Sequence, residues 1–194
     1  MKRFKEVWLN DTLKMGLIAG VVFIVYQLLI YVLDVNIFSV GFSLFSFVFT
    51  ILVLSIFMVK GIKKTNKNVA LPLNFGQKFL LAGLIGFIAS IISSLISFLI
   101  NFVIDFEGYQ TKIENFIFTT QDKIMSSGLS DEIIHTQMTM LDKQMERLLD
   151  PSSQLLGLLG ALIGPAIIGF IVAAVVNTKS DNPIVDEDLL INNN

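Results

Sequence analysis

The chain has 194 residues, of which 54% are hydrophobic and 15% are charged, and its formal net charge is −2. Soluble domains carry about 25% charged residues, so this composition is typical of an integral membrane protein. The small net charge gives no support for nucleic-acid binding, and the lack of cysteine excludes disulfides and thiolate metal sites. The single histidine, His135, has no ligand partners at suitable spacing, so we expect no metal and no cofactor.

Four stretches are long and apolar enough to cross a membrane, because a transmembrane helix needs about 20 mainly apolar residues. They cover residues 15–33, 37–59, 79–104 and 155–176, and none of them contains a charged residue or histidine. The first has a basic N-terminal flank but no A-x-A-like cleavage site after it, so we expect it to be retained. The sequence therefore predicts an all-α integral membrane four-helix bundle, forming a single domain over residues 1–194.

Lysine and arginine concentrate on one side of these spans. The N-terminal segment, the loop 60–78 and the C-terminal segment carry ten, whereas the turn 34–36 and the segment 105–154 carry four. By the positive-inside rule, both termini and the loop 60–78 are predicted to be cytoplasmic, with 105–154 outside. The acidic tail 180–194 is expected to be flexible. Four lysines of the loop are candidates for contact with anionic lipid: Lys60, Lys63, Lys64 and Lys67.

The third span is preceded by a helix-start signal. Asn74 and Gln77 have the spacing of a capping box, and Pro72 keeps the helix from starting earlier. Lys78 is expected to extend toward the lipid headgroups. Gly76 has no explanation as part of a helix start, and we interpret it as a candidate for close packing or a contact.

The outer segment 105–154 shows two amphipathic helical patterns on either side of residues 126–130. Gly128 suits the left-handed residue that closes a helix, Ser130 suits the next N-cap, and Pro151 ends the second helix. The pattern predicts an antiparallel hairpin that buries its own seam. The alternative is a hairpin that binds a partner or dimerises. The predicted seam residues are Ile113, Phe116, Ile134, Met138, Leu141 and Met145.

Small and weakly polar residues recur every three or four positions within the spans. Such faces allow helices to approach closely, and Pro165 is expected to bend the fourth span. The candidate packing residues are Gly16, Gly20, Gly83, Gly86, Ser90, Ser94, Ser97, Gly157, Gly160 and Gly164. The alternative is a polar path for a solute, lined by Ser, Thr and Asn. An ion-coupled carrier is disfavoured, because such proteins keep an ionisable residue inside the membrane.

The sequence contains none of the phosphate-binding, dinucleotide-binding, zinc-protease or serine-hydrolase motifs that were sought. Asn101, Asp105 and Glu107 are the best candidates for a polar site at the bilayer edge, and they equally fit an ordinary helix end. We therefore expect a protein that is not an enzyme. It would act as a scaffold or accessory subunit, with the lipid bilayer, a second copy or another membrane protein as its partner.

The order of these features resembles a bacterial membrane-protein family called domain of unknown function 4199. The similar parts are G-x-x-x-G in the first span, the lysine-rich loop, N-F-G-Q-K-F before the third span, 128-GLSDEII-134 and a glycine-rich last span. The resemblance covers nearly the whole chain. It implies no known activity and no known site residues.

Overall fold

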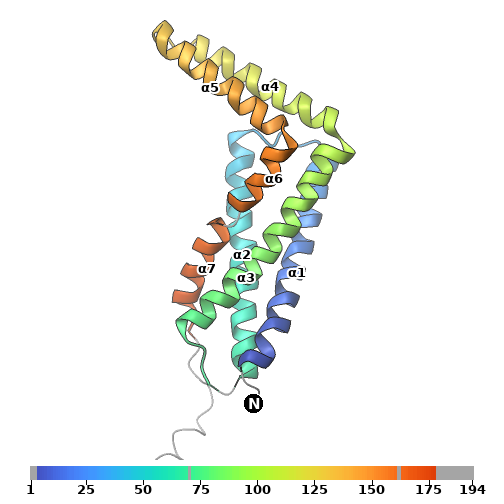
Figure 1. Cartoon of the computed structure of the whole chain (residues 1–194), viewed down its shortest axis with the longest axis vertical. Helices are drawn as coiled ribbons and strands as arrows, with labels where there is room; N and C mark the ends of the chain where they lie inside the picture. Colours follow the sequence, from blue (N-terminus) through green and yellow to red (C-terminus); the bar gives the residue numbers. More distant parts are fainter. Residues whose placement is uncertain (1–3, 70, 161–162, 178–194) are drawn as a thin grey trace, which may run out of the picture.

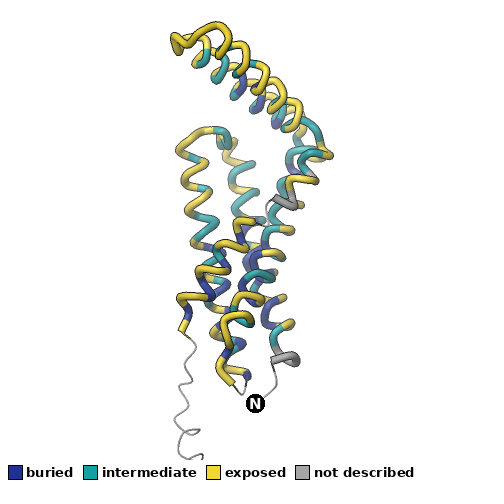
Figure 2. The backbone as a smooth tube through the Cα atoms, turned by 60° about the vertical axis from the view of Figure 1, so that its left-hand side comes forward, coloured by how far each residue is buried: buried dark blue, intermediate teal, exposed yellow. Residues whose placement is uncertain are grey.

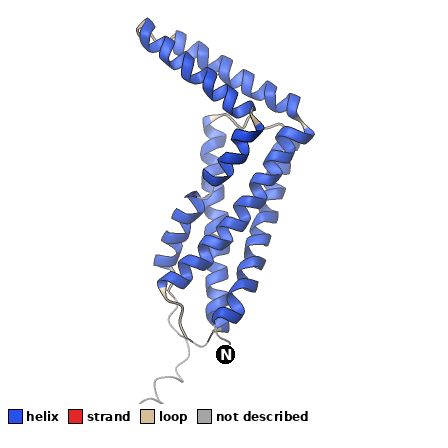
Figure 3. Ribbon diagram, in the orientation of Figure 1, coloured by secondary structure: helices blue, strands red, loops and turns tan. Residues whose placement is uncertain are grey.

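The structure, a computed structural model, describes residues 4–69, 71–160 and 163–177. Within these ranges the fold is all-α and contains no strand (Figure 3). The elements are α1 (Phe4–Val32), α2 (Val40–Asn68), α3 (Phe75–Phe98), the π-helix η1 (Leu99–Ile104), α4 (Phe106–Met125), α5 (Asp131–Leu149), α6 (Pro151–Gly160) and α7 (Ile163–Val175).

The long helices form an elongated bundle with α3 in contact with α1, α2 and α7 (Figure 1). Its core includes the fully buried Leu54, Met58, Ile62, Leu81 and Ile85. Among the described residues, three helices are long and apolar enough to cross a membrane: Trp8–Val32, Val40–Asn68 and Phe75–Ile104. The chain is therefore a membrane-type helical protein, as its composition predicts.

The fourth predicted span, 155–176, includes residues 161–162, which lie outside the described residues. On either side of them the chain is helical, as α6 to Gly160 and as α7 from Ile163. Pro165 is buried in α7, and the bend expected at this proline stays a prediction.

Two helices extend further than the apolar pattern indicated. The first begins at Phe4, and α2 continues through the lysines of the predicted loop 60–78 as far as Asn68. The connection to α3 is thereby shortened to residues 69–74. The reason is tertiary, since the polar turns added to each helix bind one another through Asp11, as described below.

The capping box before α3 is confirmed. The Asn74 amide donates to Gln77 Oε1 at 3.0 Å, and the Gln77 amide donates to Asn74 Oδ1 at 2.9 Å. Gly76 is exposed, and a Cβ added there would meet only Asn74 Oδ1, at 3.6 Å. Gly76 therefore makes no close packing contact. Lys78 donates to the Val176 carbonyl at 2.9 Å, which joins the start of α3 to the end of α7.

Removing this cap should weaken the start of α3. We expect Asn74→Ala to lower the free energy of unfolding by about 1 kcal/mol, because the Gln77 amide loses its acceptor. Denaturation followed by circular dichroism in detergent would measure this. Asn74→Asp, which preserves the acceptor, is the control and should stay close to wild type.

The helices α4 and α5 lie side by side across one end of the bundle (Figures 1 and 2). We call this the turn end, because the α1–α2 turn, residues 33–39, lies there. Gly128 has φ +69°, as the sequence predicts for the residue that closes α4. Ser130 occupies the N-cap position of α5 without a side-chain bond to the helix.

The seam between α4 and α5 buries Ile113 and Leu141, and Met145 packs against it. Phe116 instead stacks on Phe38 of the α1–α2 turn, with ring centroids 5.0 Å apart. The other buried members of this cluster are Tyr109 and Ile117, and the predicted seam residues Ile134 and Met138 are half-buried. The two helices thus pack on the bundle as well as on each other.

Candidate functional site

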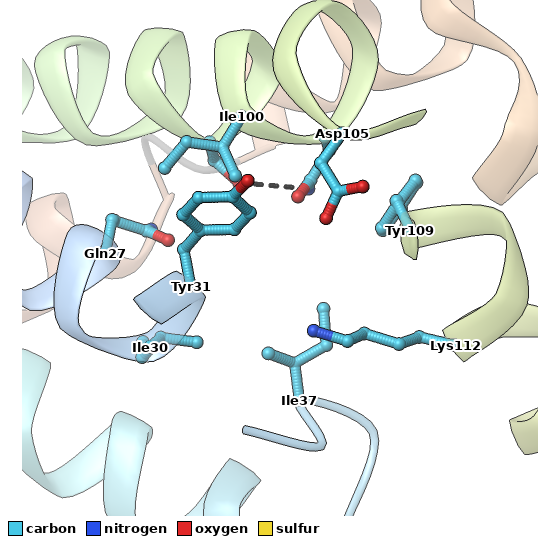
Figure 4. Close-up of a pocket in the computed structure, with 10 residues that line it drawn as sticks. Gln27, Ile30, Tyr31, Ile37, Ile100, Asp105, Tyr109 and Lys112 are labelled. Atoms are coloured by element: carbon cyan, nitrogen blue, oxygen red, sulfur yellow. Dashed lines mark hydrogen bonds between the residues drawn. The ribbon is translucent and has the colours of Figure 1, made fainter. Parts of the chain in front are cut away.

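A small polar pocket lies at the turn end, where α1, η1 and α4 meet (Figure 4). Its volume is about 60 Å³. Gln27 and Tyr31 reach it from α1, and the ammonium of Lys112 reaches it from α4. The remaining lining residues are Ile30, Ile37, Ser97, Ile100, Asn101, Asp105 and Tyr109. We call this the polar pocket.

The π-helix η1 shapes one wall of the polar pocket. The Asp105 amide donates to the Ile100 carbonyl at 2.9 Å, five residues back rather than the usual four. Asn101, inside η1, donates to the Ser97 hydroxyl at 3.4 Å. π-Helical turns are rare and often occur at functional sites. Nothing in the amino-acid pattern of residues 99–104 predicts this wider turn.

Asp105 caps α4 from the rim of the polar pocket. Its Oδ1 accepts the Gly108 amide at 3.1 Å. A Cβ on Gly108 would crowd this carboxylate, so a larger residue there would have to displace the Asp105 side chain. The sequence analysis singled out Asp105 and Asn101 correctly as neighbours at a helix end, whereas Glu107 is exposed and does not line the pocket. In the sequence, an aspartate three residues before a glycine could have indicated this helix cap.

A second hollow, of about 190 Å³, is lined by residues of α3, η1 and α6. It is lined by Ser94, Ser97, Phe98, Asn101, Phe102, Gln154 and Gly157. Ser97 and Asn101 therefore line both spaces. The predicted serine stripe of the third span therefore lies partly along this hollow.

The chain matches one known protein family. Residues 14–178 match the family of proteins of unknown function designated DUF4199. The chain belongs to this family. No curated protein and no solved structure matches it. The DUF4199 assignment agrees with the resemblance stated above and carries no activity or site residues.

A second polar cluster of this DUF4199 chain lies at the opposite end of the bundle, near the start of α1. Asp11 is 3% exposed, and its carboxylate accepts from Asn68 Nδ2 at 3.2 Å and from the buried Thr65 hydroxyl at 3.5 Å. Lys64 Nζ lies 3.1 Å from the other carboxylate oxygen. The sequence analysis missed this cluster, because Asp11 precedes the apolar run. The sequence nevertheless could have indicated a polar contact here, because Asp11 is a single carboxylate one helical turn before an apolar span.

This cluster changes the interpretation of the lysine-rich segment of the DUF4199 chain. Lys64 was predicted to contact anionic lipid, but its ammonium is paired with Asp11. Lys60 places its ammonium 5.8 Å from the centre of the Phe57 ring. Lys63 and Lys67 are exposed, and their contact with lipid stays a prediction. His135 is exposed, and the described residues contain no group of three potential metal ligands.

The glycines of α1 and α3 occupy close contacts between helices. A Cβ on Gly16 would lie 2.8 Å from Ile88 Cβ, and a Cβ on Gly20 would lie 3.1 Å from Ile92 Cβ. Gly86 lies against Pro165 and Met58. Close contacts also occur at Gly61, which was not among the predicted packing residues, and at Gly169, where an added Cβ would lie 3.3 Å from Ala82 Cβ.

Other predicted packing residues are less enclosed. An added Cβ would meet no atom within 4 Å at Gly83, Gly157 or Gly164. Ser90 is half-buried, as are Ser94 and Ser97. Gly160 is the last residue of α6, and its surroundings lie outside the described part of the structure. Close approach is thus concentrated on α1 and on the α3–α7 contact.

Asp150 forms the cap of α6, outside the predicted spans. The Ser152 and Ser153 hydroxyls each donate to its Oδ2 at 2.7 Å, and their amides donate at 3.1 and 3.0 Å. These bonds, that of the Ser152 hydroxyl foremost, lower the pKa of Asp150 to about 2. Burial raises the pKa of Tyr109, which donates to the Leu148 carbonyl at 3.4 Å.

The lowered pKa of Asp150 makes the first turn of α6 sensitive to acid. A carboxylate whose pKa is lowered on folding stabilises above its unfolded value of about 4, and this stability is lost as the pH falls toward 2. We expect hydrogen exchange at the Ser152 and Ser153 amides to accelerate across this window. In Asp150→Asn the step should disappear. A step of equal size in that variant would assign it to another group.

Proposed function

We propose that this protein is a non-enzymatic scaffold or accessory subunit of the bacterial inner membrane, with α4 and α5 as its presenting surface. The observation that supports this best is that contacts with the α1–α2 turn hold the α4–α5 pair against the bundle. Lys112 Nζ lies 2.7 Å from Asp34 Oδ1, and Phe116 stacks on Phe38. A pair held in this way offers a binding partner a preordered surface.

The proposed topology has four crossings, with both termini and the 69–74 link in the cytoplasm. The bond between Lys78 and the Val176 carbonyl supports this number, because it brings the end of α7 beside the start of α3. At the turn end, α6 packs on α3 and α5. The pair α6–α7 would thus return the chain across the bilayer. The count of Lys and Arg supports the orientation.

Labelling of single introduced cysteines tests this topology, since the chain has no native cysteine. Glu114→Cys and Ser127→Cys, both at exposed positions, should react with an impermeant maleimide from outside intact cells, whereas Lys63→Cys should react only after permeabilisation. Labelling of Lys63→Cys in intact cells would overturn the orientation.

The proposed partners are the lipid bilayer and either a second copy or another membrane protein, and no nucleic acid. A photo-crosslinking residue at Phe118, which is 64% exposed on α4, tests this in native membranes. We expect one discrete adduct, and we expect Gln121→Arg on the same face to weaken it. A crosslinker at the lipid-facing Ile167 is the control. A diffuse set of adducts from both positions would contradict a presenting surface on α4.

A transport or channel component is the second candidate. It is favoured by Ser97 and Asn101, which line both the polar pocket and the second hollow. If it is correct, purified protein in liposomes should pass small polar solutes, and Asn101→Leu should abolish the flux. An unchanged flux in this variant, or none in the wild type, would contradict it.

A further inference from the structure

The charges of the α4–α5 pair are separated by face. Successive residues of an α-helix are about 100° apart, so the seam residues Ile113 on α4 and Leu141 on α5 serve as reference directions. Relative to these directions, the basic side chains all lie roughly 80–160° to the negative side. They are Lys112, Lys123, Lys143 and Arg147.

The acidic side chains lie to the positive side. Five of the seven carboxylates within the two helices are roughly 80–140° from the seam in that sense. They are Glu107, Glu114, Asp131, Asp142 and Glu146. The other two, Asp122 and Glu132, point directly away from the seam. Two antiparallel helices that share a seam turn their negative sides to the same face. The pair therefore has one basic face and one acidic face.

Contacts with the bundle show which way the basic face is directed. Lys112 and Phe116 both lie on the negative side of α4, and they contact Asp34 and Phe38 of the α1–α2 turn. The basic face is therefore directed at the turn end of the bundle. The apolar helices α1 and α2 end there, with Val32 and Val40 74% and 77% exposed. For a membrane-embedded bundle, we place the surface of the bilayer near that level.

The rest of the basic face is free to meet that surface. Lys123, Lys143 and Arg147 are exposed, and none of them forms an ion pair within the described residues. Ile133 and Met140 lie on the same face and are 45% and 64% exposed. In the views of the whole chain, the pair extends past the start of α2 and slopes away from the turn end toward the α4–α5 connection (Figures 1 and 2). Exposed cations interspersed with apolar side chains are typical of helices that bind at a membrane surface.

We propose that the basic face of the α4–α5 pair docks on the anionic headgroups of the bilayer that holds the bundle. Lys123, Lys143 and Arg147 would bind lipid phosphates, while Ile133 and Met140 enter the headgroup layer. The acidic face would then be directed to water. The proposal needs only a membrane-embedded bundle, and it depends neither on the scaffold role nor on which side of the membrane the pair occupies.

Spin labels at two matched positions test the proposal. Met140 and Phe118 are each 64% exposed, the first on the basic face and the second on the acidic face. We would place Met140→Cys or Phe118→Cys in the full chain, attach a nitroxide and reconstitute it in nanodiscs. With phosphatidylglycerol present, the Met140 label should be shielded from a water-soluble nickel relaxant and reached by oxygen. The Phe118 label should stay accessible to nickel.

The charge dependence identifies the ligand as anionic lipid. Near an anionic surface, the three unpaired cations shift the equilibrium between docked and undocked pairs by on the order of 100-fold. Nanodiscs of phosphatidylcholine alone, or the K123E/K143E/R147E variant, should therefore expose the Met140 label to nickel. The matched variant E107K/E114K/E146K, on the acidic face, should leave it shielded. Helicity and elution volume would establish that each variant is folded.

Equal nickel access at Met140 and Phe118 in anionic nanodiscs would overturn the proposal. So would shielding of Met140 that appears in native membrane vesicles but never in nanodiscs, since a protein partner would then cover the basic face. Shielding that is unchanged in the triple charge-reversal variant would overturn the role of the cations. Capture of a partner at Phe118 is a separate result, so the scaffold proposal and this one can fail independently.

Discussion

Replacing Gly16 by leucine should destabilise the bundle by about 3 kcal/mol, because the added side chain enters space already filled by α3. Even a bare Cβ would lie 2.8 Å from Ile88 Cβ, an atom fixed to the backbone that cannot rotate away. The helices α1 and α3 would have to separate. Unfolding in mixed detergent micelles, followed by circular dichroism, measures the loss, and Gly86→Leu should behave similarly through Pro165.

Alanine substitutions provide a control, because one of them should raise the stability of the protein and the other should lower it. At Gly83, in the interior of α3, an added Cβ meets nothing within 4 Å, so Gly83→Ala should stabilise by about 0.5–1 kcal/mol through helix propensity. Gly16→Ala should instead lose about 1–3 kcal/mol. If both variants gained stability, the α1–α3 contact would have to be looser than the distances above indicate.

Asp11→Ala is expected to lower the free energy of unfolding by about 2 kcal/mol. The substitution leaves the fully buried Thr65 hydroxyl and the Asn68 amide without their carboxylate acceptor, and an unsatisfied buried group costs about 1–3 kcal/mol. The ion pair itself contributes less, because the Lys64 side chain is 41% exposed. The same unfolding assay would measure the change.

The neighbouring lysine provides the matched control for Asp11. Lys63 has the same charge as Lys64 but is exposed, so Lys63→Ala should stay within about 0.5 kcal/mol of wild type. Asp11→Asn, which preserves an acceptor for Thr65, should lie between wild type and Asp11→Ala. An Asp11→Ala variant as stable as wild type would show that the cluster does not hold α1 to α2.

Local signals predicted local structure well. The Asn74–Gln77 capping box and the left-handed Gly128 are both present as expected, because each depends only on residues within one helical turn. The three long apolar helices also follow directly from hydropathy, which is a property of a window and not of its neighbours.

The ends of the helices were harder to predict where contacts with another helix determine them. The polar first turns of α1 and last turns of α2 read as flanking segments, yet they are helical because Asp11 binds Thr65 and Asn68, which lie more than fifty positions away. The Lys64 ammonium was likewise predicted to contact lipid because its partner, Asp11, lies on another helix. Its partner is invisible until the helices are side by side.

By itself, therefore, the sequence determined the helical class, the apolar lengths, the caps and the membership of a membrane-protein family of unknown function. Only the tertiary structure decided which glycines are crowded, where η1 widens the helix and which face of α4 and α5 is directed at the bundle. Charges that alternate along the chain separate onto two faces only when two antiparallel helices share a seam. The physical reason is that composition and periodicity are carried by each helix alone, whereas faces, contacts and buried charge pairs belong to two helices together.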